Sequence, residues 1–127
     1  MNPHSHDPRI NQITEIVIGC AFRVHNTLGA GFLEKVYENA LAHEVRKAGL
    51  VVVQQAEINV YYDRVKVGLY AADLLVESTV LVELKAVRAP DDIHLAQCLN
   101  YLRATGLEVC LLLNIGTPRL EKKRIAL

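Results

Sequence analysis

Apolar residues recur at helical spacing through the first part of the chain, from Ile10 to His25. The positions on the predicted buried side are Ile10, Ile13, Val17, Cys20, Ala21 and Val24. Gly29 and Gly31 then interrupt the pattern and should end the helix. A second helix is predicted from about Phe32 to Ala48, with Gly49 at its C-terminal cap. Its stripe comprises Leu33, Val36, Tyr37, Ala40, Leu41, Glu44 and Val45.

After Gly49 the pattern changes to that of strands. The segment VVVQQAEINVYY is β-branched and partly alternating, and Asp63 with Arg64 marks a turn. Two further strands are predicted, from about Lys66 to Glu77 and from about Thr79 to Val87.

A third helix, IHLAQCLNYLRAT, should begin at Pro90 and the acidic pair Asp91 and Asp92, and should end at Gly106. EVCLLLNI then indicates a buried strand, and KKRIAL indicates a short edge strand. The order ααβββαβ(β) predicts a fold of class α/β (α+β), in which helices flank a mixed sheet of four to five strands.

The length of 127 residues suits one domain with one core. We expect residues 1–9 to form a flexible N-terminal segment and residues 10–127 to form the domain. His4, His6 and Asp7 could bind a metal ion, but a mobile polar terminus is the simpler expectation.

Composition excludes some functions and leaves others open. Fourteen basic and fourteen acidic residues cancel, so any polyanion would have to be met by a local basic patch. Cys20, Cys98 and Cys110 form no CxxC pair and fall on apolar stretches, which predicts reduced cysteines in the core. Neither a membrane span nor a signal-peptide core is present, so we expect a cytoplasmic protein without a membrane partner.

The stretch GLYAADLLVESTVLVELKAV carries Asp73, Glu83 and Lys85 among apolar residues. If Glu77, Ser78 and Thr79 form the turn of a hairpin, paired residues have numbers that sum to 156, so Asp73 faces Glu83. Lys85 then lies on the same side of the sheet, opposite Ala71. A two-residue turn would shift the register by one and send Asp73 to the other face.

Two carboxylates that face each other about 5 Å apart repel, and one should keep its proton unless a cation lies between them. Magnesium accepts such oxygen ligands, and manganese could replace it. A lysine beside a metal-bound water can orient that water and offset developing negative charge. The alternative is an ion pair of Lys85 with Glu83 or Asp73 at the rim of the sheet, and the spacing alone leaves both open.

These residues carry a resemblance. Asp73, followed after nine residues by Glu83, Leu84 and Lys85, resembles the D…ExK signature of the PD-(D/E)XK nuclease superfamily. VHNTLGAGFLEKVYENAL contains Gly31, Glu34 and Tyr37 in the spacing of the GxxExxY family, a bacterial and archaeal branch of that superfamily. ADLLVE, VELKAV, AQCLNYLRATG and LLLNIGTPRLEKKRI resemble further blocks of that family in the same order, so the likeness runs from about Ile13 to Leu127.

The resemblance implies a restriction-endonuclease-like core and a metal site. Asp73 and Glu83 would bind the ion, with the Leu84 carbonyl as a third oxygen ligand. Lys85 would position the attacking water. Glu34 would take the place of the superfamily's helix-borne acid, either on the metal or beside its ligands.

Gln97 and Tyr101 share a face of the third helix and resemble residues that flank the active site in related nucleases. Two positions depart from the family pattern. Ala72 stands where the superfamily signature has proline, and Ala71 stands where many family members would have arginine, so a phosphate or glutamate contact could be missing.

Structural explanations compete for several of these residues. Tyr37 lies on the apolar stripe of its helix, which favours core packing, and Gly31 suits a turn. Glu34 in the first turn of a helix also interacts favourably with the helix dipole. His25 is either a buried, hydrogen-bonded histidine of the core or a weak candidate for contacting the residues that bind the metal.

The leading hypothesis is a metal-dependent nuclease that hydrolyses phosphodiester bonds of DNA or RNA by a metal-activated water. The alternative is a catalytically silent nucleic-acid- or protein-binding module, and a third possibility is a structural domain stabilised by a metal. Neutral charge favours a partner protein or a homodimer that pools weak basic surfaces. The candidate nucleic-acid contacts are Arg88, Arg103, Arg119, Lys122, Lys123 and Arg124, although solvated surface charge is the default for each.

Overall fold

The computed structural model describes residues 7–88 and 92–127. Within them the elements are α1 (Pro8–Leu28), α2 (Glu34–Lys47), β1 (Val52–Tyr62), β2 (Val65–Val76), β3 (Val80–Lys85), α3 (Asp92–Thr105), β4 (Val109–Asn114) and β5 (Glu121–Ala126). The described strands form one sheet in the order β1-β2-β3-β4-β5. Strands β3 and β4 are parallel and the other neighbours are antiparallel. The predicted class and element order are confirmed.

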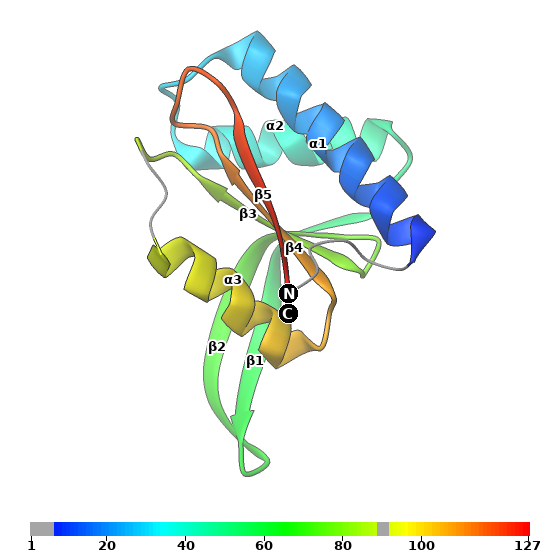
Figure 1. Cartoon of the computed structure of the whole chain (residues 1–127), viewed down its shortest axis with the longest axis vertical. Helices are drawn as coiled ribbons and strands as arrows, with labels where there is room; N and C mark the ends of the chain where they lie inside the picture. The colour runs from blue at the N-terminus through cyan, green and yellow to red at the C-terminus, as the bar shows by residue number, and fades with distance from the viewer. Residues whose placement is uncertain (1–6, 89–91) are drawn as a thin grey trace.

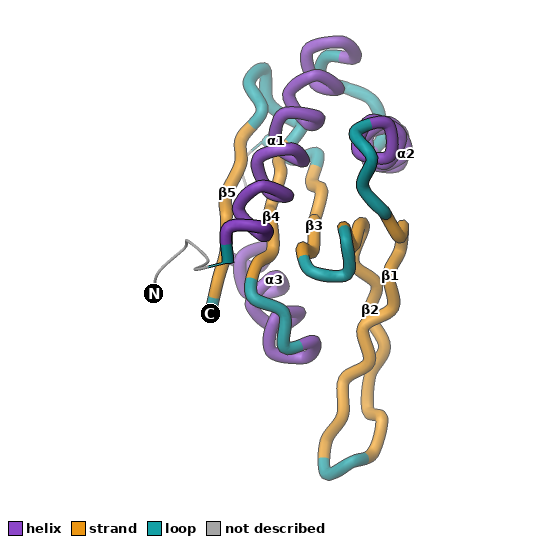
Figure 2. Tube along the Cα trace, turned by 90° about the vertical axis from the view of Figure 1, so that its right-hand side faces the viewer, coloured by secondary structure: helices purple, strands orange, loops and turns teal. Residues whose placement is uncertain are grey.

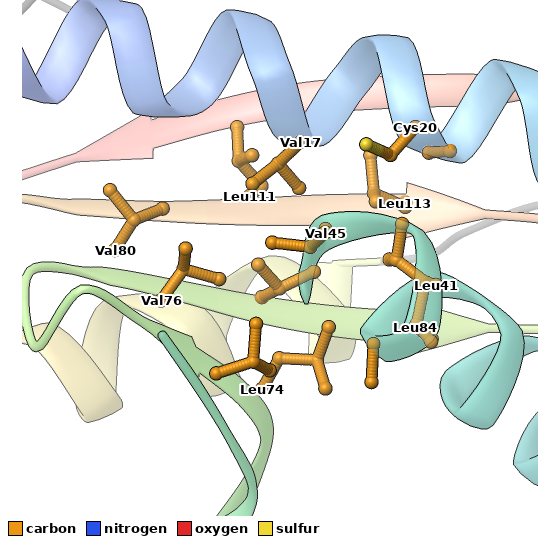
Figure 3. Close-up of a cluster of buried hydrophobic side chains, with 14 of the residues drawn as sticks. Val17, Cys20, Leu41, Val45, Leu74, Val76, Val80, Leu84, Leu111 and Leu113 are labelled. Atoms are coloured by element: carbon orange, nitrogen blue, oxygen red, sulfur yellow. The ribbon is translucent and has the colours of Figure 1, made fainter. Parts of the chain in front are cut away.

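The helices form layers on the two sides of the sheet (Figure 1). Helices α1 and α2 cover one face, and α3 lies against the other (Figure 2). The larger core fills the space between α1, α2 and the sheet, where Val17, Leu41 and Val45 meet Leu74 and Leu111 (Figure 3). Every residue of β4, and every residue of β3 except Lys85, is buried. Burial on both faces explains why these strands read as continuous apolar runs.

The cysteines lie in these cores. Cys20 belongs to the core under α1, and Cys98 and Cys110 belong to the smaller core under α3. All three are free and buried, as predicted. Within the described ranges, no helix is both long and apolar enough to cross a membrane.

Helix α1 begins two residues earlier than expected. The Asp7 side chain accepts a hydrogen bond from the Arg9 N–H at 2.9 Å, and Pro8 occupies the first turn, where its missing N–H costs nothing. Residues 1–6, which include His4 and His6, lie outside the described residues, as do Pro90 and Asp91 ahead of α3.

Helix α2 begins at Glu34, later than predicted, and Leu33 before it has extended backbone. The predicted stripe is wrong at its start, because the side chains of Leu33 and Val36 are exposed. Tyr37 is 1% exposed, as core packing requires. Its hydroxyl donates to the Gly29 carbonyl and accepts from the Phe32 N–H, so it ties together the glycine turn that leads into α2.

The hairpin of β2 and β3 has the predicted register. Val76 pairs with Val80 and Leu74 pairs with Val82, and the turn comprises Glu77, Ser78 and Thr79. The expected pairing of Lys85 with Ala71 is wrong, because the described ladder between these strands ends at Leu74. Beyond this point β2 pairs with β1 alone, and Ala71 lies opposite Glu57. The outer part of the β1–β2 hairpin extends away from the body of the molecule (Figures 1 and 2).

Candidate active site

Asp73 and Glu83 lie where β2 separates from β3, and each carboxylate bonds to the other strand. Asp73 Oδ2 accepts a hydrogen bond from the Leu84 N–H at 2.7 Å. Glu83 Oε1 accepts one from the Asp73 N–H at 3.0 Å. These crossed bonds replace the next step of the ladder. The two carboxylates therefore converge, as the predicted register requires.

Both carboxylates are destabilised in their charged forms. Burial, followed by repulsion from Asp73, raises the pKa of Glu83 from its usual 4.5 to about 7. Burial also raises the pKa of Asp73, although the hydrogen bond from Leu84 opposes the shift. Because the two groups interact, their protons leave as a coupled pair. Lys85 Nζ lies 3.8 Å from Glu83 Oε2, which is a loose ion pair that relieves this destabilisation only in part.

Helix α2 brings two more acids to the site. Glu34 Oε1 accepts a hydrogen bond from the Ala86 N–H at 3.0 Å, next to Lys85. Glu38 is 3% exposed, and its charge acts on Asp73. Lys35 Nζ lies 3.0 Å from Glu38 Oε2. Glu34 and Glu38 are one helical turn apart and share a side of the helix. That spacing could have revealed Glu38, which sequence analysis missed.

Gln55 links Glu38 to Asp73, and sequence analysis missed it as well. Its Nε2 donates to Glu38 Oε1 at 2.6 Å and to Asp73 Oδ1 at 3.3 Å. The backbone of Gln55 is left-handed, with φ of 51°, which is unusual for a residue within a strand. We infer that this local change of direction lets the side chain reach both carboxylates. No residue type near Gln55 indicates such a conformation in advance.

Helix α3 contributes the predicted pair Gln97 and Tyr101, whose side chains meet. Gln97 Nε2 donates to Tyr101 Oη at 2.8 Å. Burial, followed by the charge of Glu83, raises the pKa of Tyr101 to about 12, so its hydroxyl stays neutral. The ring of Tyr101 also packs against Tyr70 of β2, with centroids 5.9 Å apart.

An open groove of about 970 Å³ lies between α3 and the β1–β2 hairpin. Lys85, Gln97 and Tyr101 line it on the side of the carboxylates, and Tyr61 and Tyr70 line it on the side of the hairpin. Lys85, Gln97 and Tyr101 are therefore accessible to a ligand much larger than a metal ion, whereas Asp73 and Glu83 do not line the groove themselves.

The predicted basic contacts do not form one patch. Arg103 lines the groove, and Arg88 is exposed shortly after Lys85. Lys122 and Lys123 lie on β5, with β4 and β3 between them and β2. Arg124, also on β5, donates to Asn11 and Thr14 of α1, which is a structural contact. Arg119 is exposed in the loop that precedes β5.

The segment after Lys85 is held in place by the end of β4. Asn114 is buried, and its Oδ1 accepts from the Val87 N–H at 3.2 Å and from the Gly116 N–H at 3.1 Å. A Cβ on Gly116 would lie 2.5 Å from the Val87 nitrogen, so only glycine fits without movement. His25 Nε2 lies 2.9 Å from the Thr117 carbonyl oxygen in the same loop, which supports its structural explanation.

The donor set suits an ion that needs few protein ligands. Among the described residues, no group of three or more His, Cys, Asp and Glu side chains is arranged to hold a metal ion. Magnesium is commonly held by one or two carboxylates and keeps several waters. Glu83, which is buried, and Asp73, which is half-buried, repel each other and fit that requirement, because a cation would relieve their raised pKa values.

Comparison with known proteins identifies the superfamily of the chain. A sequence model described as the PD-(D/E)XK nuclease superfamily matches residues 11–125. No curated protein sequence matches the chain.

Two solved structures are similar to the fold. One is an alkaline exonuclease, LHK-Exo, from Laribacter hongkongensis, with 16% identity and a TM-score of 0.53 over 98% of this chain and 72% of that one. The other is SSO0001, with 17% identity and a TM-score of 0.49 over 90% of this chain and 65% of that one. At 16% identity the likeness to the exonuclease shows the fold alone. Since the superfamily match spans nearly the whole chain, this protein belongs to the PD-(D/E)XK nuclease superfamily.

Proposed function

We propose that this protein is a metal-dependent nuclease of the GxxExxY branch that hydrolyses phosphodiester bonds of DNA or RNA. The observation that carries the proposal is the convergence of Asp73 and Glu83 at the separation of two strands, with Lys85 Nζ 3.8 Å from Glu83. Membership of a nuclease superfamily, whose enzymes generally use divalent metals, supports it.

Asp73 and Glu83 would hold Mg²⁺, or Mn²⁺ in its place, with the Leu84 carbonyl as a further oxygen ligand. A bound divalent ion lowers the pKa of its water and offsets charge on the phosphate. The hydrogen bonds from Leu84 and Asp73 backbone groups fix the orientation of both carboxylates before any ion arrives. Such fixed orientation reduces the reorganisation that catalysis would otherwise require.

Lys85 would orient the attacking water and offset negative charge on the phosphoryl oxygens in the transition state. Its side chain is 21% exposed and held only loosely by Glu83, so it can turn toward a substrate in the groove. The neutral Tyr101 hydroxyl, fixed by Gln97, is available to hydrogen-bond a phosphate oxygen. Glu34 would hold the backbone next to Lys85 through its hydrogen bond from Ala86, and Glu38 would hold the Gln55 side chain that bonds to Asp73.

The decisive experiment compares wild type with Lys85→Ala in a cleavage assay with Mg²⁺ or Mn²⁺. The substrates are single- and double-stranded DNA and RNA. We expect a loss of roughly a hundredfold or more in rate, because the variant removes the positive charge that would offset negative charge in the transition state. Mg²⁺ affinity measured by calorimetry should stay the same or improve slightly, since the ammonium group repels the ion.

Lys47→Ala is the matched control, because Lys47 is exposed on α2 and pairs with Glu44 at 3.5 Å, away from the groove. It should cleave at the wild-type rate. Equal residual activity in wild type and Lys85→Ala would indicate a contaminating nuclease and would leave the silent binding module as the better explanation.

A further inference from the structure

We propose that the groove between α3 and the β1–β2 hairpin binds an unpaired segment of nucleic acid, whose bases stack on Tyr61 and Tyr70. This inference rests on the proposed function and deepens it, because it assigns the substrate class. Lys85 lines the groove and lies 3.8 Å from Glu83, so a strand bound along the groove would bring a phosphate close to the carboxylate pair.

The aromatic lining supports stacking. Tyr61 and Tyr70 are 61% and 53% exposed, although each lines the groove. The ring of Tyr70 packs against the ring of Tyr101, with centroids 5.9 Å apart, and this contact restricts its motion. An aromatic ring on a strand loses little conformational freedom when a base stacks on it. Stacking of this kind is tolerant of sequence, since every base has a π face.

The charge of the groove favours a single strand over a duplex. Its formal charges are Lys85 and Arg103, with His94 as a third basic group, and none of the described residues that line it is acidic. Duplex binding depends mainly on many phosphate contacts, which two cations cannot supply. The lysines of β5 lie across the sheet and cannot extend this set. The affinity must therefore come largely from base contacts, which a duplex hides within its stack.

A second copy of the chain is the competing occupant. The hairpin exposes further apolar side chains that do not line the groove, namely Tyr62, Val65, Val67 and Leu69. The groove itself carries Gln97, Asn100 and Arg103, which suit a polar ligand with phosphates better than an apolar subunit interface. We therefore assign the groove to nucleic acid and treat a dimer as an outcome of the test.

The test is binding of fluorescein-labelled oligonucleotides, measured by anisotropy in EDTA so that no cleavage occurs. Single-stranded DNA and RNA are compared with the matching duplexes. Wild type should bind a single strand at least tenfold more tightly than the duplex. Two phosphate contacts on a single strand predict that log K falls with log salt at a slope of about −1.4.

Tyr61→Ala should weaken single-strand binding roughly 5-fold to 100-fold through the loss of one stacked base. Tyr61→Phe should keep most of the affinity, because the π face remains. Tyr62→Ala is the matched control: Tyr62 is 66% exposed on the same hairpin but does not line the groove, so this variant should bind like wild type.

Equal losses in Tyr61→Ala and Tyr62→Ala, or duplex binding as tight as single-strand binding, would overturn the proposal. So would light scattering that shows a dimer of wild type and a monomer of Tyr61→Ala, since the groove would then be a subunit interface. Binding that depends on Tyr61, without any cleavage, would refute the nuclease and leave this inference standing. Cleavage of a duplex at the same rate by wild type and Tyr61→Ala would support the nuclease and refute this inference.

Discussion

Replacing Glu83 by glutamine should make the metal-free protein more stable. Glu83 is 3% exposed, and its nearest cation, Lys85, is 3.8 Å away. Glutamine keeps the oxygen that accepts the Asp73 N–H at 3.0 Å and removes the charge. The rise in the Glu83 pKa from 4.5 to about 7 corresponds to roughly 3 kcal/mol of penalty on the charged form. An imperfectly bonded amide would offset part of this, so we expect a gain of about 1–2 kcal/mol.

The sign of the pH dependence follows from the direction of the shift. A carboxyl with a raised pKa in the folded state stabilises the fold fully below about pH 4.5, and this contribution is lost as the pH rises through about 7. The charged form of Glu83 should therefore destabilise the wild type at about pH 8, and protonation should remove most of this destabilisation at about pH 5. The advantage of Glu83→Gln should be largest at the higher pH and should shrink as the pH falls.

The assay is thermal unfolding followed by circular dichroism in EDTA. At about pH 8 we expect Glu83→Gln to melt roughly 5 °C above wild type. Excess Mg²⁺ should reverse the order, because ligand binding stabilises only the protein that retains the site. Glu15→Gln, an exposed position on α1, is the control and should change neither value. If Glu83→Gln melts at or below the wild-type temperature in EDTA at about pH 8, Lys85 already compensates the charge and the ion-pair explanation stands.

Two further predictions concern metal binding and the loop behind the site. Mg²⁺ affinity should rise as the pH increases through about 7, because the proton on Glu83 must leave before the ion binds. Calorimetry in buffers of different ionisation enthalpy should detect this proton release near pH 6. A Mg²⁺ affinity that is flat between about pH 6 and 8 would contradict the prediction. Gly116→Ala should lower stability by roughly 1–3 kcal/mol in thermal unfolding, because its Cβ would meet the Val87 nitrogen at 2.5 Å. Gly19→Ala, a helical position with nothing within 4 Å, should be neutral or stabilising, and equal melting of the two variants would refute the steric argument.

The register of the charged hairpin could be predicted because sequence contains its determinants. A three-residue turn is the alternative that brings Asp73, Glu83 and Lys85 to one face, which favours it over a two-residue turn, and the pairing of Leu74 with Val82 confirms its register. A one-residue slip would have reversed every side chain of β3. Glu34 could also be assigned to the site, although only through a motif resemblance, since its spacing alone equally suits a helix-dipole contact.

Other features depend on neighbours that local pattern does not reveal. Periodicity shows that β2 is a strand but cannot show that its outer half leaves β3 to pair with β1, so the expected Ala71–Lys85 pairing was wrong. Leu33 continued the apolar stripe, yet α2 begins after it and its side chain is 79% exposed. Glu38 and Gln55 are joined only in the folded chain, where a left-handed residue in β1 meets the buried face of α2.

The same departure of β2 from β3 creates both parts of the proposed site. Where the ladder stops, the Asp73 and Leu84 N–H groups donate their hydrogen bonds to the two carboxylates. Beyond that point the freed hairpin runs beside α3, and the space between them is the groove that carries Tyr61, Tyr70 and Arg103. Charged groups at the end of a buried strand are costly unless something compensates them. A cation bound where the strands separate would compensate the two carboxylates, and a phosphate of the bound strand would compensate Lys85. A structural ion pair at the sheet rim would need neither of these ligands.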